Sequence, residues 1–188
     1  TKHWETALLY VKCVSRNANL KYTQFNYLHQ TYLTPHRLHA MFPAVSTKCP
    51  RCTCEDDGFL HMVWQCVDLR QRWEQVMSVI AGIIDIRLPT TPQVCLLGVT
   101  TQTKQNKTSL RFADLAMVIF KRLIAKTLKA STPPALAEWL REVHKWAIVE
   151  ADVLACMIKQ RGGDTQITIW DTYVAKIATQ MTGARAVG

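Results

Sequence analysis

The chain has 188 residues, of which 48% are hydrophobic and 20% are charged, and its formal net charge is +9. These proportions exclude a disordered polymer and suffice for one folded domain, or for a small module joined to a larger one. No run of about eighteen apolar residues occurs, so we expect no segment that spans a membrane.

Positive charge is concentrated in two blocks of the sequence. Residues 1–54 contain seven Lys or Arg against one Glu, and residues 100–130 contain seven against one Asp. Residues 55–99 instead contain six acidic residues and three basic ones. Basic blocks separated by an acidic one are typical of a protein that binds a polyanion, although a merely solubilising surface produces the same pattern.

Apolar residues recur at helical spacing along most of the chain, and strand signals are nearly absent. Pairs of Thr and Pro have the form of an N-cap followed by the first helical residue, at Thr34, Thr91 and Thr132. Residues 100–109 are polar and are expected to form a loop. We therefore expect an all-α fold, with amphipathic helices in its C-terminal part. The predicted helices cover about 22–33, 35–42, 68–83, 92–98, 109–130, 133–161 and 168–181.

These elements suggest three segments around one cysteine-rich stretch. They are a basic helical linker at 1–45, a zinc knuckle with packing helices at 46–99, and a C-terminal helical segment at 100–188.

The stretch "KCPRCTCEDDGFLHMVWQC" at 48–66 contains four of the seven cysteines and one histidine. Cys49 and Cys52 have the spacing that lets two thiolates approach one ion from a tight turn. Together with His61 and Cys66 they provide a ligand set of three sulfurs and one imidazole nitrogen. This set is usual for structural Zn²⁺, and it leaves no coordination position open for water. His61 and Cys66 are five residues apart, about 140° around an α-helix, so the helix must end or bend near Cys66.

Other interpretations of the cysteines remain open. They are a redox Cys-x-x-Cys pair, an iron–sulfur cluster with Cys54 as the fourth thiolate, and chance clustering of core cysteines. Cys54 is also an alternative to Cys52 as a zinc ligand. Cys13, Cys95 and Cys156 stand alone and are expected to be small buried hydrophobes. The odd number of cysteines favours a reducing, intracellular location over a disulfide framework.

Basic residues near the cysteines and at the end of the 109–130 helix are the candidate phosphate contacts. Arg51 lies between two candidate ligands, so a bound ion would hold it in place for a phosphate or a base. Tyr27 is a candidate for stacking on unpaired bases. The predicted nucleic-acid-binding residues are Arg37, Lys48, Arg51, Lys121, Arg122, Lys126 and Lys129.

The order "YTQFNYLHQTYLTPHRLHAMFPAVSTKCPRC", then "GFLHMVWQCVDLRQRWEQV", resembles the C-terminal region of non-LTR (LINE-type) retrotransposon reverse transcriptases. The resemblance covers about residues 15–100. It implies that Cys49, Cys52, His61 and Cys66 bind zinc, and that the segment follows a polymerase domain in a longer parent protein. It also implies RNA or target-site DNA as partner during target-primed reverse transcription, in the nucleus and cytoplasm.

No catalytic constellation accompanies these motifs. The Tyr/Phe-x-Asp-Asp polymerase motif is absent, and Glu55, Asp56 and Asp57 are consecutive residues of a polar loop. We therefore expect this chain alone to be a binding module rather than an enzyme, and an independent nuclease is disfavoured. The alternative is a scaffold that docks on the polymerase core or a host protein without contacting nucleic acid.

Overall fold

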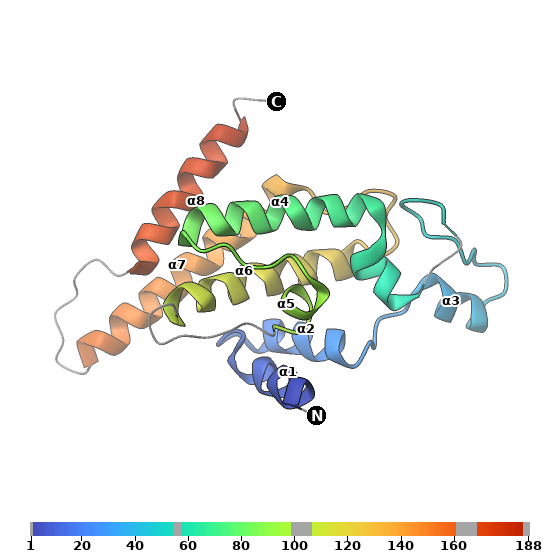
Figure 1. Cartoon of the computed structure of the whole chain (residues 1–188), viewed down its shortest axis with the longest axis horizontal. Helices are drawn as coiled ribbons and strands as arrows, with labels where there is room; N and C mark the ends of the chain where they lie inside the picture. The colour runs from blue at the N-terminus through green and yellow to red at the C-terminus, as the bar shows by residue number, and fades with distance from the viewer. Residues whose placement is uncertain (1, 55–57, 99–106, 161–168, 186–188) are drawn as a thin grey trace.

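The structure is a computed structural model that describes residues 2–54, 58–98, 107–160 and 169–185 (Figure 1). Within these ranges every regular element is a helix, which confirms the predicted all-α fold class. The elements are α1 (Lys2–Cys13), α2 (Ala18–Leu28), α3 (Pro35–Met41), η1 (His61–Gln65), α4 (Val67–Ile84), α5 (Pro92–Cys95), α6 (Lys107–Lys126), α7 (Leu136–Gln160) and α8 (Ile169–Arg185).

Polar side chains cap several helix N-termini. Thr34 Oγ1 accepts a hydrogen bond from Arg37 N–H before α3, and Thr91 Oγ1 accepts one from Val94 N–H before α5, as their Thr-Pro pairs predict. Asn17 Oδ1 accepts from two backbone N–H groups at the start of α2. The prediction for Thr132 was wrong, because α7 begins only at Leu136. The two prolines that follow Thr132 disfavour helical backbone in the residues before them.

Helix α6 forms the centre of the molecule. Every residue from Phe112 to Lys121 is buried, and the helix contacts α2, α4, α7 and η1. A helix that is apolar all round must be enclosed by other helices, since it has no face to present to water. Trp73 of α4 packs edge-on against Phe120 of α6, with ring centroids 4.7 Å apart. Trp139 of α7 donates its indole N–H to Ala116 O of α6 at 2.9 Å.

The outer helices close around this centre. Helix α8 lies against α7 and α4 (Figure 1), and Lys176 of α8 donates to Ile83 O at 2.9 Å. Arg16 pairs with the buried Glu150 of α7 at 2.9 Å, which supplies this carboxylate with a partner. One hydrophobic core, from Tyr10 to Ile177, includes residues of all three predicted segments. No described helix is both long and apolar enough to cross a membrane.

Helix α2 buries a different face from the predicted one. Helical spacing predicted an apolar face of Tyr22, Phe25, Leu28 and Tyr32. Leu28 is buried as expected and Tyr32 is half-buried, but Tyr22 and Phe25 are exposed, and Leu20 and Tyr27 are buried in their place. The predicted stacking residue Tyr27 is therefore unavailable to a nucleic acid, and its hydroxyl donates to Lys121 O at 2.8 Å. Helical period alone does not distinguish these faces, because aromatic residues lie on both.

Candidate metal centre and basic face

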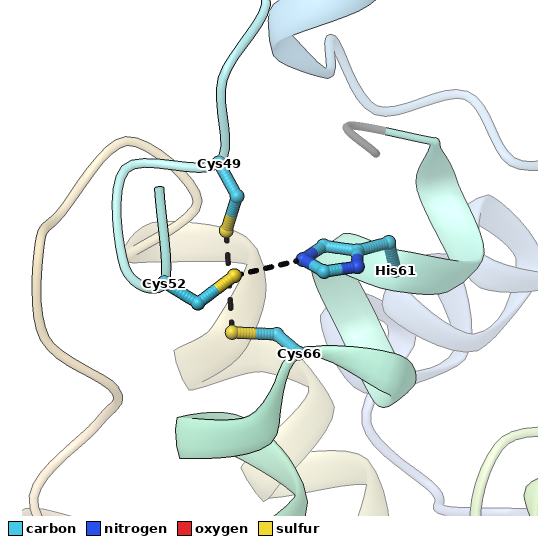
Figure 2. Close-up of side chains that lie close together, drawn as sticks. All are labelled: Cys49, Cys52, His61 and Cys66. Atoms are coloured by element: carbon cyan, nitrogen blue, oxygen red, sulfur yellow. Dashed lines mark hydrogen bonds between the residues drawn. The ribbon is translucent and has the colours of Figure 1, made fainter. Parts of the chain in front are cut away.

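The side chains of Cys49, Cys52, His61 and Cys66 converge on one point (Figure 2). Their ligand atoms all lie within 4.8 Å of one another, and every one of these residues except Cys52 is buried. The predicted ligand set is thus assembled, and these four residues can hold a metal ion.

The separations of the ligand atoms match a small tetrahedral ion. Zn–S bonds of about 2.3 Å and Zn–N bonds of about 2.0 Å imply S···S separations of about 3.8 Å and S···N separations of about 3.5 Å. Cys49 Sγ lies 4.0 Å from Cys66 Sγ, and Cys52 Sγ lies 3.3 Å from His61 Nε2. Three sulfurs and one imidazole favour zinc over the hard cations, which take oxygen ligands.

A tight turn positions the first two cysteines. Thr53 N–H donates to Cys49 O, and Cys49 N–H donates to Cys54 O, both at 2.9 Å. Thr53 has φ of 59°, an uncommon conformation for a residue with a branched side chain. The turn thus brings Cys49 and Cys52 to one side of the chain, while Cys54 contributes its backbone and leaves its side chain exposed. Cys54 is not part of the ligand cluster.

A π-helical turn brings the other two ligands together. Cys66 N–H donates to His61 O at 3.0 Å, a bond from residue i+5 to residue i, whereas an α-helix joins residue i+4 to residue i. Cys66 itself leaves the helical region, with φ of −53° and ψ of 127°. The predicted bend between His61 and Cys66 is therefore confirmed, and it consists of a widened turn followed by a break.

Residues of the hydrophobic core support this turn by packing and by a hydrogen bond. Met62, Val63 and Trp64 are buried, and the Trp73 indole N–H donates to Val63 O at 3.0 Å. Trp64 packs on Trp73 with ring centroids 5.8 Å apart. A π-helical turn is rare and frequently lies at a functional site. The hydrogen bond from buried Trp73 to this turn therefore indicates that the positions of His61 and Cys66 are fixed.

Cys49 and Cys52 have opposite pKa shifts. Burial raises the pKa of Cys49, but hydrogen bonds from the backbone N–H groups of Cys52 and Arg51 bring it below its usual value. Desolvation, together with the neighbouring Cys49 and Cys66 thiols, raises the pKa of Cys52 to about 11. Because a metal binds the thiolate, ion binding must release protons from this site.

Arg51 has a different role from the predicted phosphate contact. Only 8% of its surface is exposed, and its guanidinium donates to Met62 O and to Thr127 O, each at 2.9 Å. Met62 belongs to the π-helical turn and Thr127 follows the last residue of α6. Arg51 therefore joins the cysteine turn to the end of α6, and its nitrogens are directed inward rather than toward a nucleic acid.

Lys121, another predicted nucleic-acid contact, is also unavailable to a nucleic acid. It is 0% exposed, and its ammonium donates to Gln24 Oε1 and, at 3.3 Å, to Leu96 O. Burial lowers its pKa to about 7, although the nearby Asp114 and Cys95 act in the opposite direction. A charged residue on a helix was expected to face water, but α6 is enclosed on the side where Lys121 lies.

The remaining predicted cations stay accessible. Arg37, Lys48, Lys126 and Lys129 are exposed, and Arg122 is half-buried. Arg37 donates to Gln30 O and so also holds the turn before α3. Of the lone cysteines, Cys95 is buried as expected, whereas Cys13 and Cys156 are exposed.

Two cavities meet at Lys129. A cavity of about 590 Å³ is bordered by Lys126 and Lys129 of the segment that ends α6, and by the aromatic residues Tyr22, Phe25 and Tyr32. A second cavity, of about 660 Å³, lies beside the cysteine turn and is bordered by Lys48 and Lys129 and by apolar residues such as Phe42. We call the surface around both cavities the basic face. Sequence analysis named Tyr22 among the aromatic residues that could stack on bases, but it missed Phe25 as part of this face.

No protein-family model matches the chain, and no curated protein matches it. The resemblance to LINE-type reverse transcriptases thus stays a prediction.

Proposed function

We propose that this chain is a zinc-stabilised module that binds single-stranded or locally opened nucleic acid, RNA or a target-site junction, through its basic face. The observation that carries the proposal is the position of Lys129, which borders both the aromatic cavity and the cavity beside the metal centre. Cations that track a phosphate backbone beside aromatic rings that stack on bases are the usual elements of single-strand binding.

The aromatic side of the face suits unpaired bases. Tyr22 is 65% exposed, and Phe25 and Leu33 beside it are exposed as well. Lys126 and Lys129 lie within the same cavity wall, so a strand whose bases contact Tyr22 keeps its phosphates within reach of both ammonium groups. Stacking on such rings contributes about 1–3 kcal/mol per base and does not depend on the sequence of the strand.

A hydrogen-bonded side chain connects the metal centre to the basic face. Arg51 links the cysteine turn to Thr127, which lies between Lys126 and Lys129. An ion held by Cys49, Cys52, His61 and Cys66 therefore fixes the segment that carries those two lysines. With all four ligand positions supplied by protein, the ion has a structural role. We infer zinc as the metal from the ligand set, and we propose binding rather than catalysis for the chain.

The parent protein and its process follow from the resemblance. We propose that the chain belongs to the C-terminal region of a LINE-type reverse transcriptase and assists target-primed reverse transcription beside the polymerase domain. The all-α fold and the assembled Cys/His cluster support this proposal.

A scaffold function is the second candidate, and the cavity beside the cysteine turn favours it. Its wall includes Leu38, Phe42 and Val45, and Phe42 is largely exposed. An exposed apolar side chain in a concave site is also what a protein partner, such as the polymerase core or a host protein, would cover.

Fluorescence anisotropy with a labelled single-stranded RNA separates the two candidates. We expect the variant Lys126→Ala/Lys129→Ala to lose about tenfold in affinity, and its plot of log K against log salt to become shallower by about 1.4, because each phosphate contact contributes about 0.7. The matched control is Lys145→Ala/Lys159→Ala, which removes the same charge from exposed positions of α7 outside both cavities. An equal loss of RNA affinity in both variants would mean that the RNA binds through net charge alone, and this result would favour the scaffold function.

A further inference from the structure

The cavity beside the cysteine turn combines an apolar wall with a basic rim. Its volume of about 660 Å³ is within the range of pockets that hold small ligands. Lys48 and Lys129 border it, and no acidic residue borders it within the described part of the chain. The apolar residues of the wall include Pro35, Leu38, Val45, Pro50 and the 60% exposed Phe42. The cavity thus suits a ligand that has both an apolar part and a negative charge.

Hydrogen bonds fix the segments that form this cavity. Helix α3 lies at the edge of the molecule and buries none of its residues (Figure 1). His39 Nδ1 donates to Val45 O at 2.7 Å, and Val45 N–H donates to Phe42 O at 2.9 Å, so the segment after α3 is held against the helix. The cysteine turn, which supplies Pro50 and Thr53 to the wall, is closed by its own hydrogen bonds. The cavity is therefore formed before a ligand binds, which lowers the entropic cost of binding.

The two lysines indicate which ligand suits this cavity. Both are exposed, and an apolar side chain of a protein partner would leave their ammonium groups without a negative partner. A nucleotide of an unpaired strand brings a flat base for the apolar wall and phosphates for the lysines. Lys129 also borders the cavity that contains Tyr22, so the two cavities adjoin along the surface proposed to bind the strand. These observations favour a nucleotide as the occupant.

We propose that this cavity holds one unstacked base of the bound strand against the ring of Phe42, with the adjoining phosphates on Lys48 and Lys129. None of the described side chains that border it is an amide, a carboxylate or a guanidinium, groups that commonly read base edges, so the site accepts any base. A base in a duplex must unpair and unstack before it can enter, so the site requires a single strand or an opened junction. The inference deepens the proposed function and rests on it, because it adds a second base site to the basic face.

Fluorescence anisotropy of the full chain with two labelled strands of equal length tests this inference. One strand is a single-stranded RNA, and the other is a sugar–phosphate strand that carries no bases. We expect Phe42→Leu, which removes the ring but keeps an apolar side chain, to lower the affinity for RNA about tenfold, the scale of stacking one base. Its affinity for the strand without bases should be unchanged. A folding defect would weaken the binding of both strands equally, so the comparison isolates the ring.

Two control variants belong to the same experiment. Phe42→Trp keeps an aromatic ring and should keep the affinity for RNA. Met41→Ala removes an exposed apolar side chain of α3 that does not border the cavity, and it should bind both strands like the unaltered chain. In each of these variants the slope of log K against log salt should stay the same, because no cation is removed. The slope thus distinguishes the loss of the ring from the loss of charge in Lys126→Ala/Lys129→Ala.

Equal affinity of the unaltered chain and Phe42→Leu for RNA would overturn the inference. An equal loss for both strands, or an equal loss in Met41→Ala, would overturn it as well. If Lys126→Ala/Lys129→Ala still weakens RNA binding in such a case, the proposed function stands, and the cavity is left for a protein partner. If no strand binds the unaltered chain, the proposed function fails, and this inference fails with it.

Discussion

The guanidinium of Arg51 donates a hydrogen bond to the carbonyl oxygen of Thr127 at 2.9 Å, across 76 positions of sequence. Its other terminal nitrogen donates to Met62 O. One side chain thus connects the turn that carries Cys49 and Cys52, the π-helical turn between His61 and Cys66, and the end of α6. Through this connection, a metal ion bound by the three cysteines and His61 would stabilise the segment that carries Lys126 and Lys129.

Arg51→Met should therefore reduce stability rather than charge-dependent binding. The buried Met62 carbonyl oxygen and the partly buried Thr127 carbonyl oxygen would lose their donor, and we expect the free energy of unfolding to fall by about 2–4 kcal/mol. Because Arg51 reaches no phosphate, the salt dependence of RNA binding should be unchanged where the variant is folded. Urea unfolding and a salt titration measure the two quantities. A shallower salt dependence with unaltered stability would restore Arg51 as a phosphate contact.

Lys121 should produce an unusual pH dependence of stability. Its pKa is about 7 in the folded chain because of burial, against an ordinary 10.5. Between these values Lys121 holds a proton in the unfolded chain but not in the folded chain. The free energy of unfolding therefore rises with pH in this window. Below pH 7 both states hold the proton, and Lys121 contributes no further change of stability with pH. We expect a slope of about 1 kcal/mol per pH unit.

The matched comparison for Lys121 is Lys121→Met, which keeps the apolar stem. Subtracting the unfolding free energies of the variant from those of the unaltered chain at pH 7, 8 and 9 removes the contribution of the thiols, which titrate in the same range. The difference should grow with pH. Identical slopes in both proteins would mean that Lys121 keeps its ordinary pKa despite its burial.

Gly98 and Gly82 offer a paired test of the packing between α1 and the segment after α5. Gly98 has φ of 70°, and a Cβ built on it would lie 2.4 Å from ring atoms of Tyr10, whereas one on Gly82 would meet nothing within 4 Å. Gly98→Ala should destabilise the chain by about 2 kcal/mol or more, from overpacking and strain. Gly82→Ala, inside α4, should stabilise it by about 0.5–1 kcal/mol. Thermal unfolding of both variants checks the sign of each effect.

Local features were predictable because short-range chemistry determines them. The caps at Thr34 and Thr91 depend on residues within one helical turn, and the ligand set from Cys49 to Cys66 lies within eighteen positions. The bend before Cys66 also followed from spacing alone, since an α-helix would have separated it from His61. The hydrogen bond that widens this turn required the structure.

The exposure of the basic side chains could not be predicted, because it depends on which other elements pack against their helix. Lys121 and Lys126 lie on the same helix within five positions, yet one is fully buried against Gln24 and the other is exposed. The difference arises from α2, whose position relative to α6 no local pattern specifies. The same contact buries Tyr27 together with Leu28 and leaves Tyr22 in solvent, so the buried face of α2 is rotated from the expected one.

His61→Ala should unfold or strongly destabilise the chain, whereas Cys54→Ser should not. Removing one of four ligands lowers the affinity for the ion. In small zinc peptides the binding free energy of the ion, about 10–16 kcal/mol, contributes directly to folding. Cys54 lies two residues from Cys52 but outside the ligand cluster, so its serine variant controls for the loss of a nearby side chain. Circular dichroism during heating compares the two. Equal melting temperatures for His61→Ala and the unaltered chain would exclude a structural ion at this site.

The metal content of the purified, folded chain tests the central claim most directly. Elemental analysis by mass spectrometry should find one zinc ion per chain, retained in Cys54→Ser, and removal of that ion by a chelator should abolish both the folded state and RNA binding. A folded chain that contains no zinc, or one that keeps its fold and its affinity after the ion is removed, would contradict the account.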